Sequence, residues 1–508
     1  MFCEEQGVRQ SWGYTDSIPE RPRDGHKKMW DWLNEIMVGS RKCFTREASF
    51  KWFVVVVIGL MIGQEHLGIT SIVRELYLNP RHYETMLHLF RSSAWNMGLL
   101  RNWWIGIVVQ SGLLFREGGM PILIGDGVKE SKEARKMPCV KRLHQDSENS
   151  SVPSYMFGHM FGAIGVLAGS LGKLFCVPLS MRIHDGDAQI KQWAGCDAIP
   201  ESHVVRMIRE AGQVAVHLGK SILLLDRYYL SVPGLKAWIE EEINAGRPLL
   251  SLVMRAKGNP AAYNEPVPKP GRGRPRKKGE KIKVGDLFEN CKDAFTQAKV
   301  ILYGKEETIS YLCRDLLWGQ KLYRKLRFVL VTCGGTKSIF VSTDLTLSPE
   351  QIIRLYGYRF KIECCFRELK QVIAGFVYRF WTSSMPKLNR YAKSGTDPLQ
   401  TVTADKDKAR ILAAFMAVER FVMTACLALG LLQLCSLRFA AEINASPLRW
   451  LRTRSNLVPS EATTAHFMRK TIFFKSASSP VFPIFRFITD RQSSISTDTF
   501  HPDFQQVA

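Results

Sequence analysis

The sequence of 508 residues predicts an α/β protein with a mixed central sheet. Three observations indicate this fold class. Apolar runs of strand length recur between residues 116 and 257, with one amphipathic helical pattern among them. Residues 1–115 have a helical texture without strand alternation, and residues 258–344 contain glycine and proline turns between strand-like runs. We therefore expect a helical N-terminal domain, an α/β core buried on both faces, and a β-rich insertion domain within that core.

The composition favours a polyanionic partner. Seventy Lys and Arg residues against 47 Asp and Glu residues give a formal net charge of +23. Because 46% of the residues are hydrophobic, the chain is not an intrinsically disordered basic tail. Such a surplus repels itself unless a nucleic acid or an anionic membrane screens it. The twelve cysteines contain no C-x-x-C pair, so we expect reduced thiols in a cytoplasmic protein and no zinc site.

No segment is predicted to span a membrane. The first thirty residues mix charges and prolines without the apolar region of a signal peptide. The apolar run from Phe53 to Gly63 has about half the length of a span, and the run from Phe421 to Leu437 is also short and contains polar residues. Both are expected to form buried helices.

Residues 1–115 are expected to form a helical domain that binds DNA. The segment from Gly68 to Ala94 predicts two helices broken at Asn79-Pro80, because a residue before proline avoids the α conformation. It is either a helix-turn-helix in a DNA groove or an ordinary helical hairpin. In the first case the DNA contacts would be Arg74, Arg81, His82 and Arg91.

Two buried strands of the core are each followed by an acidic residue. The run from Pro121 to Gly125 leads to Asp126, and the run from Ser221 to Leu225 leads to Asp226. The first part of the core is assigned to residues 116–257. Its other expected elements are strands at Tyr155–Gly169, Leu174–Ile183 and Leu249–Met254 and a helix at Glu201–Leu218 that ends at Gly219.

The insertion, residues 258–344, begins with a stretch too rich in proline for regular structure. Strand-like runs on either side of Gly334-Gly335 predict a hairpin. The second part of the core, residues 345–437, opens at Ser348-Pro-Glu-Gln351, where the serine is placed to cap a helix and the glutamine to complete a capping box. Residues 438–508 form a tail for which dimerisation and DNA contact both stay open.

The helix expected from Pro349 carries the most informative pattern. At about 100° per residue, four polar side chains fall within roughly 60° of one another beside an apolar stripe. They are Tyr356, Arg359, Glu363 and Lys370. An ordinary ion pair between Arg359 and Glu363 is the alternative interpretation.

Asp126, Asp226 and Glu363 are expected to converge at the carboxyl edge of the sheet. Three oxygen ligands in one place repel one another unless divalent cations neutralise them. Two Mg²⁺ ions can activate a water on one side of a phosphorus and stabilise the leaving oxygen on the other, which is phosphoryl transfer on DNA. Asp185 and Asp187 also follow a strand and compete as ligands, although their Asp-Gly-Asp setting is typical of a turn.

Tyr356-x2-Arg359-x3-Glu363-x6-Lys370 matches the Y-x2-R-x3-E-x6-K signature of DDE transposases from bacterial insertion sequences, and the chain resembles this family over roughly residues 68–437. Four further segments of the chain resemble the regions around the first and second catalytic acids of this family. They are Ile124-Gly-Asp-Gly-Val-Lys-Glu130, Lys141-Arg-Leu-His-Gln-Asp146, Phe157-Gly-His-Met-Phe-Gly162 and Leu223-Leu-Leu-Asp-Arg-Tyr-Tyr229.

The resemblance implies a ribonuclease H-like core with Asp126, Asp226 and Glu363 as the catalytic, metal-binding triad for Mg²⁺, with Mn²⁺ as a substitute. It implies cut-and-paste transposition: endonucleolytic nicking at the inverted-repeat end of the element, a hairpin, and joining of the 3′ end to target DNA. It assigns phosphate and terminal-nucleotide contacts to Tyr356, Arg359 and Lys370, and it implies a homodimer on paired ends of double-stranded DNA at the bacterial nucleoid.

A basic segment precedes the β-rich part of the insertion. Eight basic residues fall between Lys269 and Lys283, and Arg272-Gly-Arg-Pro275 resembles an AT-hook, which is thin enough for a minor groove. The expected DNA contacts are Arg272, Arg274, Arg276, Lys277 and Lys278. A disordered basic loop is the alternative. Lys129, Lys132, Arg135 and Lys141 follow the first acid and are either further DNA contacts or solvated side chains.

Three functions therefore stay open at this stage. The leading one is a DNA transposase. The others are a ribonuclease H-like nuclease that cuts without joining, and a DNA-binding protein that has lost catalysis or been repurposed. Trp318, in the insertion, is expected in the core, with a wedge for a flipped base as the alternative.

Overall fold

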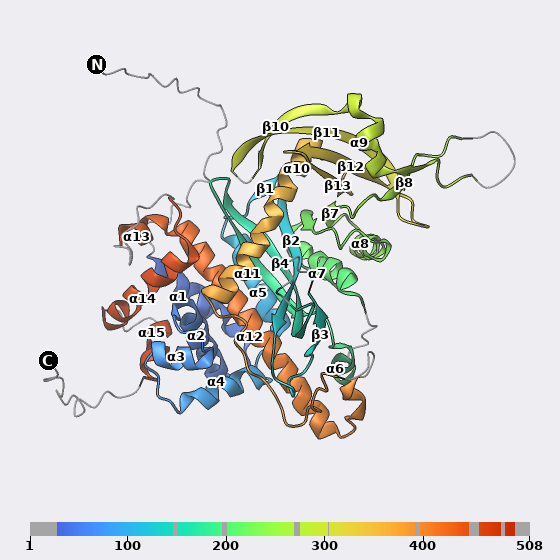
Figure 1. Cartoon of the computed structure of the whole chain (residues 1–508). Coiled ribbons are helices and arrows are strands. Elements are labelled where there is room, and N and C mark those ends of the chain that lie inside the picture. Colours follow the sequence, from blue (N-terminus) through green and yellow to red (C-terminus); the bar gives the residue numbers. More distant parts are fainter. Residues whose placement is uncertain are drawn as a thin grey trace, which may run out of the picture.

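A computed structural model describes residues 28–492, apart from 146–150, 152, 196–200, 269–274, 303, 392–396, 447–456 and 479–482. Figure 1 shows a central sheet, a group of helices from both ends of the chain on one side of it, and the insertion at its far end. The expected α/β class with a mixed sheet is confirmed.

Five neighbouring strands form the centre of the sheet. Their order is β5 (Lys173–Ile183), β4 (Tyr155–Ser170), β2 (Met120–Ser131), β6 (Ser221–Leu225) and β7 (Leu250–Arg255). The first three are antiparallel to one another in turn, whereas β6 and β7 run parallel to β2. Their apolar runs are buried on both faces, as the sequence predicted. Strand β2 continues six residues past its expected end at Gly125, because its pairing with β4 extends to Ser131.

Helices α7 (His203–Leu218) and α8 (Val232–Ala245) connect and cover these strands. Helix α7 begins where the Ser202 side chain accepts a hydrogen bond from the Val205 N–H, and it ends at Gly219, whose φ of 85° favours glycine. Helix α8 has the same kind of cap at Ser231. The short α6 (Ala188–Trp193) follows β5. These caps fix the loops on either side of α7, which matter for the site described below.

The insertion extends the central sheet. Its hairpin of β12 (Arg324–Cys333) and β13 (Thr336–Ser342) turns at Gly334-Gly335, as predicted, and β13 pairs with β7. The long β11 (Lys305–Trp318) pairs with β12 and with β10 (Thr296–Leu302); neither β10 nor β11 was predicted, because charged residues interrupt their alternation. The remaining strands of the sheet are β1 (Arg116–Glu117), β3 (Lys141–His144), β8 (Ala261–Tyr263) and β9 (Lys281–Lys283), and the insertion also contains the short helix α9 (Leu287–Asn290). The sheet therefore has 13 strands.

Helices from the two ends of the chain share one core. The N-terminal helices are α1 (Met29–Gly39), α2 (Glu47–Ile62), α3 (Ile69–Glu75), α4 (His82–Arg91) and α5 (Met97–Gln110), with the predicted break at Asn79-Pro80 between α3 and α4. The C-terminal ones are α13 (Ala440–Ala445), α14 (Glu461–Ser478) and α15 (Pro483–Thr489). The Trp30 indole N–H donates to the Thr471 hydroxyl over 2.9 Å, and the Arg469 guanidinium donates to the Ile62 carbonyl over 2.6 Å.

The apolar runs that resembled membrane segments lie in buried helices. Residues from Phe53 to Ile62 of α2 are all buried. The second run lies in α12 (Asp405–Arg438), which is long and apolar enough to cross a membrane by length and composition. Its apolar window is 83% buried inside the protein, packed against β5 and the terminal helices. This burial is typical of a core helix.

Helix α10 (Pro349–Gly357) begins with the predicted capping box. The Ser348 hydroxyl accepts from the Gln351 N–H over 3.2 Å, and the Ser348 N–H donates to the Gln351 side chain over 2.9 Å. We expect Ser348→Ala to lower the free energy of unfolding by about 1 kcal/mol, because it leaves an N–H of the first turn without a partner. Urea unfolding tests this. A loss no larger than that of Ser383→Ala, at an exposed serine, would contradict it.

Candidate active site

Asp126 and Asp226 lie side by side at neighbouring strands. The parallel register pairs Ile124 of β2 with Leu224 of β6, so two further residues along each chain bring the two acids level with one another. Strand β6 ends at Leu225, and Asp226 opens a turn in which the Tyr229 N–H donates to the Asp226 carbonyl over 3.1 Å. Asp126 lies within β2 rather than after its end, because β2 keeps its pairing with β4.

The signature segment forms two helices rather than the one expected. Helix α10 ends at Gly357, residues Tyr358–Phe360 form a 3₁₀ turn, and α11 (Lys361–Gln371) follows. Glycine is a weak helix former, and a 3₁₀ turn winds more tightly than an α-helix, so the uniform 100° per residue does not hold here. This correction changes where the four polar side chains point.

Two of those side chains contact the strand acids, and the third, Glu363, joins them through Arg359. The Arg359 guanidinium contacts Asp126 over 2.7 Å through Nη1, and Glu363 over 3.5 Å through Nη2. The Tyr356 hydroxyl donates to the Asp226 carboxylate over 3.3 Å. Five predicted site residues from three distant segments therefore come together. The alternative of an ion pair between Arg359 and Glu363 is also present, within this larger cluster.

Lys370 lies apart from that cluster, about two turns beyond Glu363 on α11. Its ammonium contacts the Glu130 carboxylate over 2.5 Å. It lines an open groove of about 520 Å³ whose wall also includes Glu363. The other lining residues are Gly127, Val128, Lys129, Gln145, Phe366, Arg367 and Gln371. The groove thus joins the acid cluster to three cationic side chains.

The electrostatics of the cluster raise the proton affinity of one acid. Burial raises the pKa of Asp126 to about 6; the Arg359 charge opposes this shift, while Glu363 and Asp226 add to it. Burial likewise raises the pKa of Tyr356, and the neighbouring Asp226 contributes to that shift. The pKa of Arg359 is raised although burial opposes it, because four neighbours including Asp126 favour the cation. The carboxylates are therefore close enough to repel one another.

We expect Asp126→Asn to stabilise the metal-free protein at alkaline pH. Between an unfolded pKa of 3.8 and a native pKa of about 6, the native state holds a proton that the unfolded state has released. The free energy of unfolding of the natural protein therefore falls as pH rises through this window, by about 1–3 kcal/mol, and the variant lacks this loss. Urea unfolding in a chelator at pH 4.5 and pH 8 measures it; a difference that does not grow with pH would count against it.

The fit of this cluster to a metal ion is partial. Three carboxylates that repel one another are the oxygen donors that Mg²⁺ prefers. Within the part of the chain that the structure describes, however, no group of three or more His, Cys, Asp and Glu side chains is arranged to hold a metal ion. Arg359 bridges Asp126 and Glu363 instead, so a cation shared by these acids requires the guanidinium to move.

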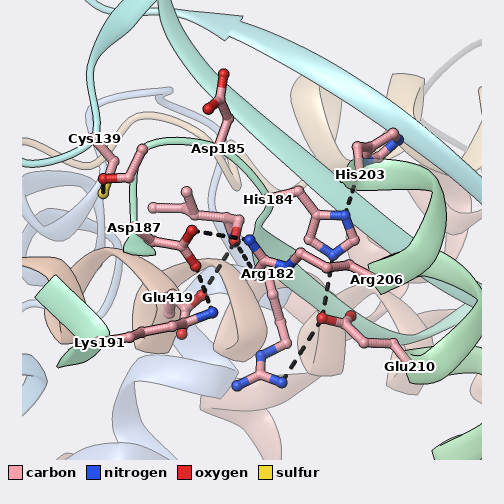
Figure 2. Close-up of polar contacts among 12 residues, drawn as sticks. Cys139, Arg182, His184, Asp185, Asp187, Lys191, His203, Arg206, Glu210 and Glu419 are labelled. Atoms are coloured by element: carbon pink, nitrogen blue, oxygen red, sulfur yellow. Dashed lines mark hydrogen bonds and ion pairs between the residues drawn. The ribbon is translucent and has the colours of Figure 1, made fainter. Parts of the chain in front are cut away.

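The competing acids have partners of their own. Asp187 forms ion pairs with Lys191 and, over 2.9 Å, with Arg206, and Asp185 forms one with Lys141 over 2.7 Å. Gly186 between them has a φ of 81°, in agreement with the predicted turn. Figure 2 shows Asp187 with its partners Lys191 and Arg206. These partners give both acids a structural role in the loop.

The cations expected near the first acid differ in accessibility. Lys132 is half-buried; its ammonium donates to the Phe376 carbonyl and lies 3.9 Å from the centre of the Tyr378 ring. Lys141 is the partner of Asp185, and Lys129 donates to the His144 carbonyl over 2.5 Å at the groove. Arg135 is exposed. Arg135 and Lys141 are therefore more exposed than Lys129 and Lys132, although Lys141 is paired with Asp185.

The candidate DNA contacts elsewhere are only partly described. Arg272 and Arg274, and with them most of the AT-hook segment, lie outside the described residues. Arg276 and Lys277 are exposed. Lys278 lies 4.1 Å from the ring centre of Tyr263 and 5.1 Å from that of Tyr323, so its charge already has an aromatic partner. Trp318 is half-buried against the core of the insertion, at the end of β11.

Three of the four candidate DNA contacts in the N-terminal helices have intramolecular partners. Arg74 pairs with Glu65 over 2.9 Å, the His82 ring lies 4.9 Å from the Trp52 ring, and Arg91 donates to the Trp381 carbonyl over 3.4 Å. Arg81 is exposed. This arrangement favours the ordinary helical hairpin for α3 and α4.

Sequence reasoning missed a group of polar residues beneath the acids. The group includes His203 and Glu210 of α7 and His184, which follows β5. Tyr229 joins these residues to the Asp226 turn through its contact with His203. Only Tyr229 lay within a segment that the sequence analysis singled out; the other three are separated along the chain and carry no spacing pattern.

Comparisons of the chain with protein-family models, with curated proteins and with solved structures gave no match.

Proposed function

We propose that this protein is a DDE-type DNA transposase that cleaves the inverted-repeat ends of its own mobile element and joins them to target DNA. The observation that carries the proposal is the meeting of Asp126, Asp226 and Glu363 with Arg359 and Tyr356, from segments about one hundred residues or more apart. An ordinary structural ion pair does not require three acids and two phosphate-binding side chain types in one cluster.

The strand order supports a ribonuclease H-like core as part of the same proposal. Three antiparallel strands, β5, β4 and β2, are followed by β6 and β7 parallel to β2, with α7 and α8 as connections. Two of the acids come from the neighbouring strands β2 and β6, and the third comes from the helix pair after the insertion. All three therefore lie beside the carboxyl end of β6, and ligands of α/β sheets commonly bind at the carboxyl ends of strands.

In this proposal Asp126, Asp226 and Glu363 hold Mg²⁺, or Mn²⁺ in its place. When bound, the metal supplies charge neutralisation at the phosphate and lowers the pKa of water. The protein's own groups orient the DNA. Arg359, once its carboxylates bind metal, presents a planar fork to a phosphate, and Tyr356 presents a hydroxyl beside Asp226. The raised pKa of Tyr356 keeps this hydroxyl protonated and able to donate.

The groove beside the acid cluster is the proposed path of the DNA backbone. Lys129, Arg367 and Lys370 line it. Lys370 pairs with Glu130, and the Arg367 guanidinium pairs with its neighbour Glu368, so phosphates entering the groove would exchange with these carboxylates. A DNA strand in this groove would reach the acid cluster, and its phosphates would contact the ammonium and guanidinium groups that line the groove. The same proposal includes a homodimer on two paired ends, acting at the nucleoid in the bacterial cytoplasm.

An assay with purified protein tests the function. Labelled duplexes containing the DNA that flanks the coding sequence are incubated with Mg²⁺ or Mn²⁺, and products are separated on denaturing gels. The transposase predicts nicked, hairpin and joined products that need the metal. Cleavage without joining would instead indicate a nuclease, and binding without cleavage would indicate a DNA-binding protein that has lost catalysis.

A further inference from the structure

A chain of buried and half-buried polar side chains leads from α7 to the turn that carries Asp226. His184 follows β5, His203 begins α7, and Glu210 lies two turns further along α7. The two Nδ1 atoms of the imidazoles are 2.8 Å apart, and His184 Nε2 lies 3.2 Å from Glu210 Oε1. At the other end, His203 Nε2 lies 2.7 Å from the Tyr229 hydroxyl. Figure 2 shows the part of the chain from His203 to Glu210.

With His184 neutral, the chemistry of the end groups fixes the direction of every hydrogen bond among these four residues. Burial would raise the pKa of Glu210, but the hydrogen bond from His184 and the charges of Arg182 and Arg206 hold it below its ordinary value. Glu210 is therefore an anion that only accepts, so His184 donates from Nε2 and, when neutral, accepts at Nδ1. His203 then donates from Nδ1 and accepts from the Tyr229 hydroxyl at Nε2.

Two glycines provide the space for the imidazoles. Gly127 and Gly162 are direct partners in the register of β2 and β4. A Cβ atom at Gly162 would lie 2.0 Å from Cε1 of His184, and a Cβ atom at Gly127 would lie 3.0 Å from Nε2 of His203. Since Gly127 directly follows Asp126, the His203 ring packs against the segment that carries the first acid.

Stability alone does not explain this series of hydrogen-bonded polar side chains. Glu210 is only 6% exposed, and its Oε2 atom has no hydrogen-bond partner among the described residues. Burying a carboxylate with one oxygen unsatisfied costs free energy that a well-packed apolar side chain would avoid. The polar chain instead spans the two segments that carry acids: His203 lies against Gly127 beside Asp126, and Tyr229 closes the turn that follows β6.

We propose that Glu210, His184 and His203 act through Tyr229 to hold the Asp226 turn at a fixed place relative to Asp126. This inference rests on the proposed function, because it assigns these four residues as positioning residues of the same acid site. Tyr229 is 2% exposed, and its hydroxyl has its hydrogen-bond partner at His203. Groups that orient metal ligands typically change metal affinity by about 10–100-fold when they are removed.

The test is a double-mutant cycle on the full-length protein. Tyr229→Phe removes the hydroxyl, Glu210→Gln removes the anion but keeps an acceptor for His184, and the double variant combines them. Mn²⁺ affinity is measured by isothermal titration calorimetry, and the single-turnover rate of DNA cleavage is measured at saturating protein. Tyr228→Phe, at the exposed neighbouring tyrosine, is the matched control.

We expect Tyr229→Phe to weaken Mn²⁺ binding by roughly 10–100-fold and Glu210→Gln by a smaller factor. In the Tyr229→Phe background, Glu210→Gln should have no further effect, because its influence passes through the missing hydroxyl. Additive losses, or an unchanged affinity in Tyr229→Phe, would overturn the inference. If the natural protein neither binds Mn²⁺ nor cleaves DNA, the proposed function itself fails, and this inference fails with it.

A second measurement on the natural protein does not depend on the variants folding. The ¹⁵N chemical shifts of labelled histidines report which ring nitrogen carries hydrogen. The chain requires the Nδ1–H tautomer for His203 and the Nε2–H tautomer for His184 at neutral pH. The opposite pair of tautomers, or a doubly protonated ring in either residue, would rule out the proposed direction of the chain.

Discussion

Asp226→Asn is expected to lower the rate of metal-dependent DNA cleavage by roughly 10³-fold or more while leaving DNA binding nearly unchanged. Asp226 lies beside Asp126 and accepts from the Tyr356 hydroxyl, so its loss removes one of the three carboxylates proposed to hold the metal. Metal catalysis supplies several kcal/mol of transition-state stabilisation, and each 1.4 kcal/mol corresponds to about a factor of ten in rate. The measurement is a single-turnover cleavage rate with labelled DNA in Mg²⁺.

The matched control is Asp185→Asn. Asp185 is also an acid after a strand, but its side chain is 44% exposed and pairs with Lys141. Its replacement should leave the cleavage rate within about twofold of the natural protein. Cleavage that survives Asp226→Asn would remove Asp226 from the proposed metal site, and a large loss in Asp185→Asn would favour the competing acid.

Binding to duplex DNA should weaken steeply with salt. With six to ten phosphate contacts, raising the salt concentration from about 50 to 200 mM is expected to weaken affinity by roughly 10³–10⁵-fold, because bound phosphates release their counterions. The net charge of +23 and the cations of the groove motivate this expectation. Fluorescence anisotropy at a series of salt concentrations measures the slope, and a nearly flat response would contradict phosphate-driven binding.

The basic segment makes a separate contribution to this slope. Arg276 and Lys277 are exposed, so replacing both by Ala should reduce the magnitude of the slope by roughly one for each phosphate that the variant no longer binds. Lys299→Ala is the control, since this exposed lysine lies on β10 and pairs with Glu306. Equal slopes for the two variants would show that the segment does not bind phosphates.

Much of the central sheet could be predicted because its strands contain apolar runs bounded by turns. Ser221–Leu225 was predicted with its limits, as was the capping box at Ser348. Periodicity reports local geometry, however, and β10 and β11 contain too many charged residues to show it. The pairing of β13 with β7 joins segments about 85 residues apart, and no local pattern encodes that register.

The candidate site likewise contains residues that the sequence predicted and residues that it did not. Asp126, Asp226, Arg359 and Glu363 were found because acids at strand ends and a spaced helical motif are visible along the chain. The 3₁₀ turn at Tyr358–Phe360 was missed, since a single glycine gives only a weak signal. The buried chain from Glu210 to Tyr229 was missed because its hydrogen bonds exist only after β5, α7 and the β6 turn have packed together.

The central claim is that Asp126, Asp226 and Glu363 share one divalent cation site, and iron-directed cleavage of the polypeptide tests it most directly. Fe²⁺ accepts the same oxygen ligands, and with ascorbate and peroxide it produces radicals that cut the nearby backbone. In the presence of duplex DNA, we expect cuts close to all three residues, suppressed by excess Mg²⁺ and absent in Asp226→Asn. Cuts near Asp185 and Asp187, or none that Mg²⁺ suppresses, would contradict the claim.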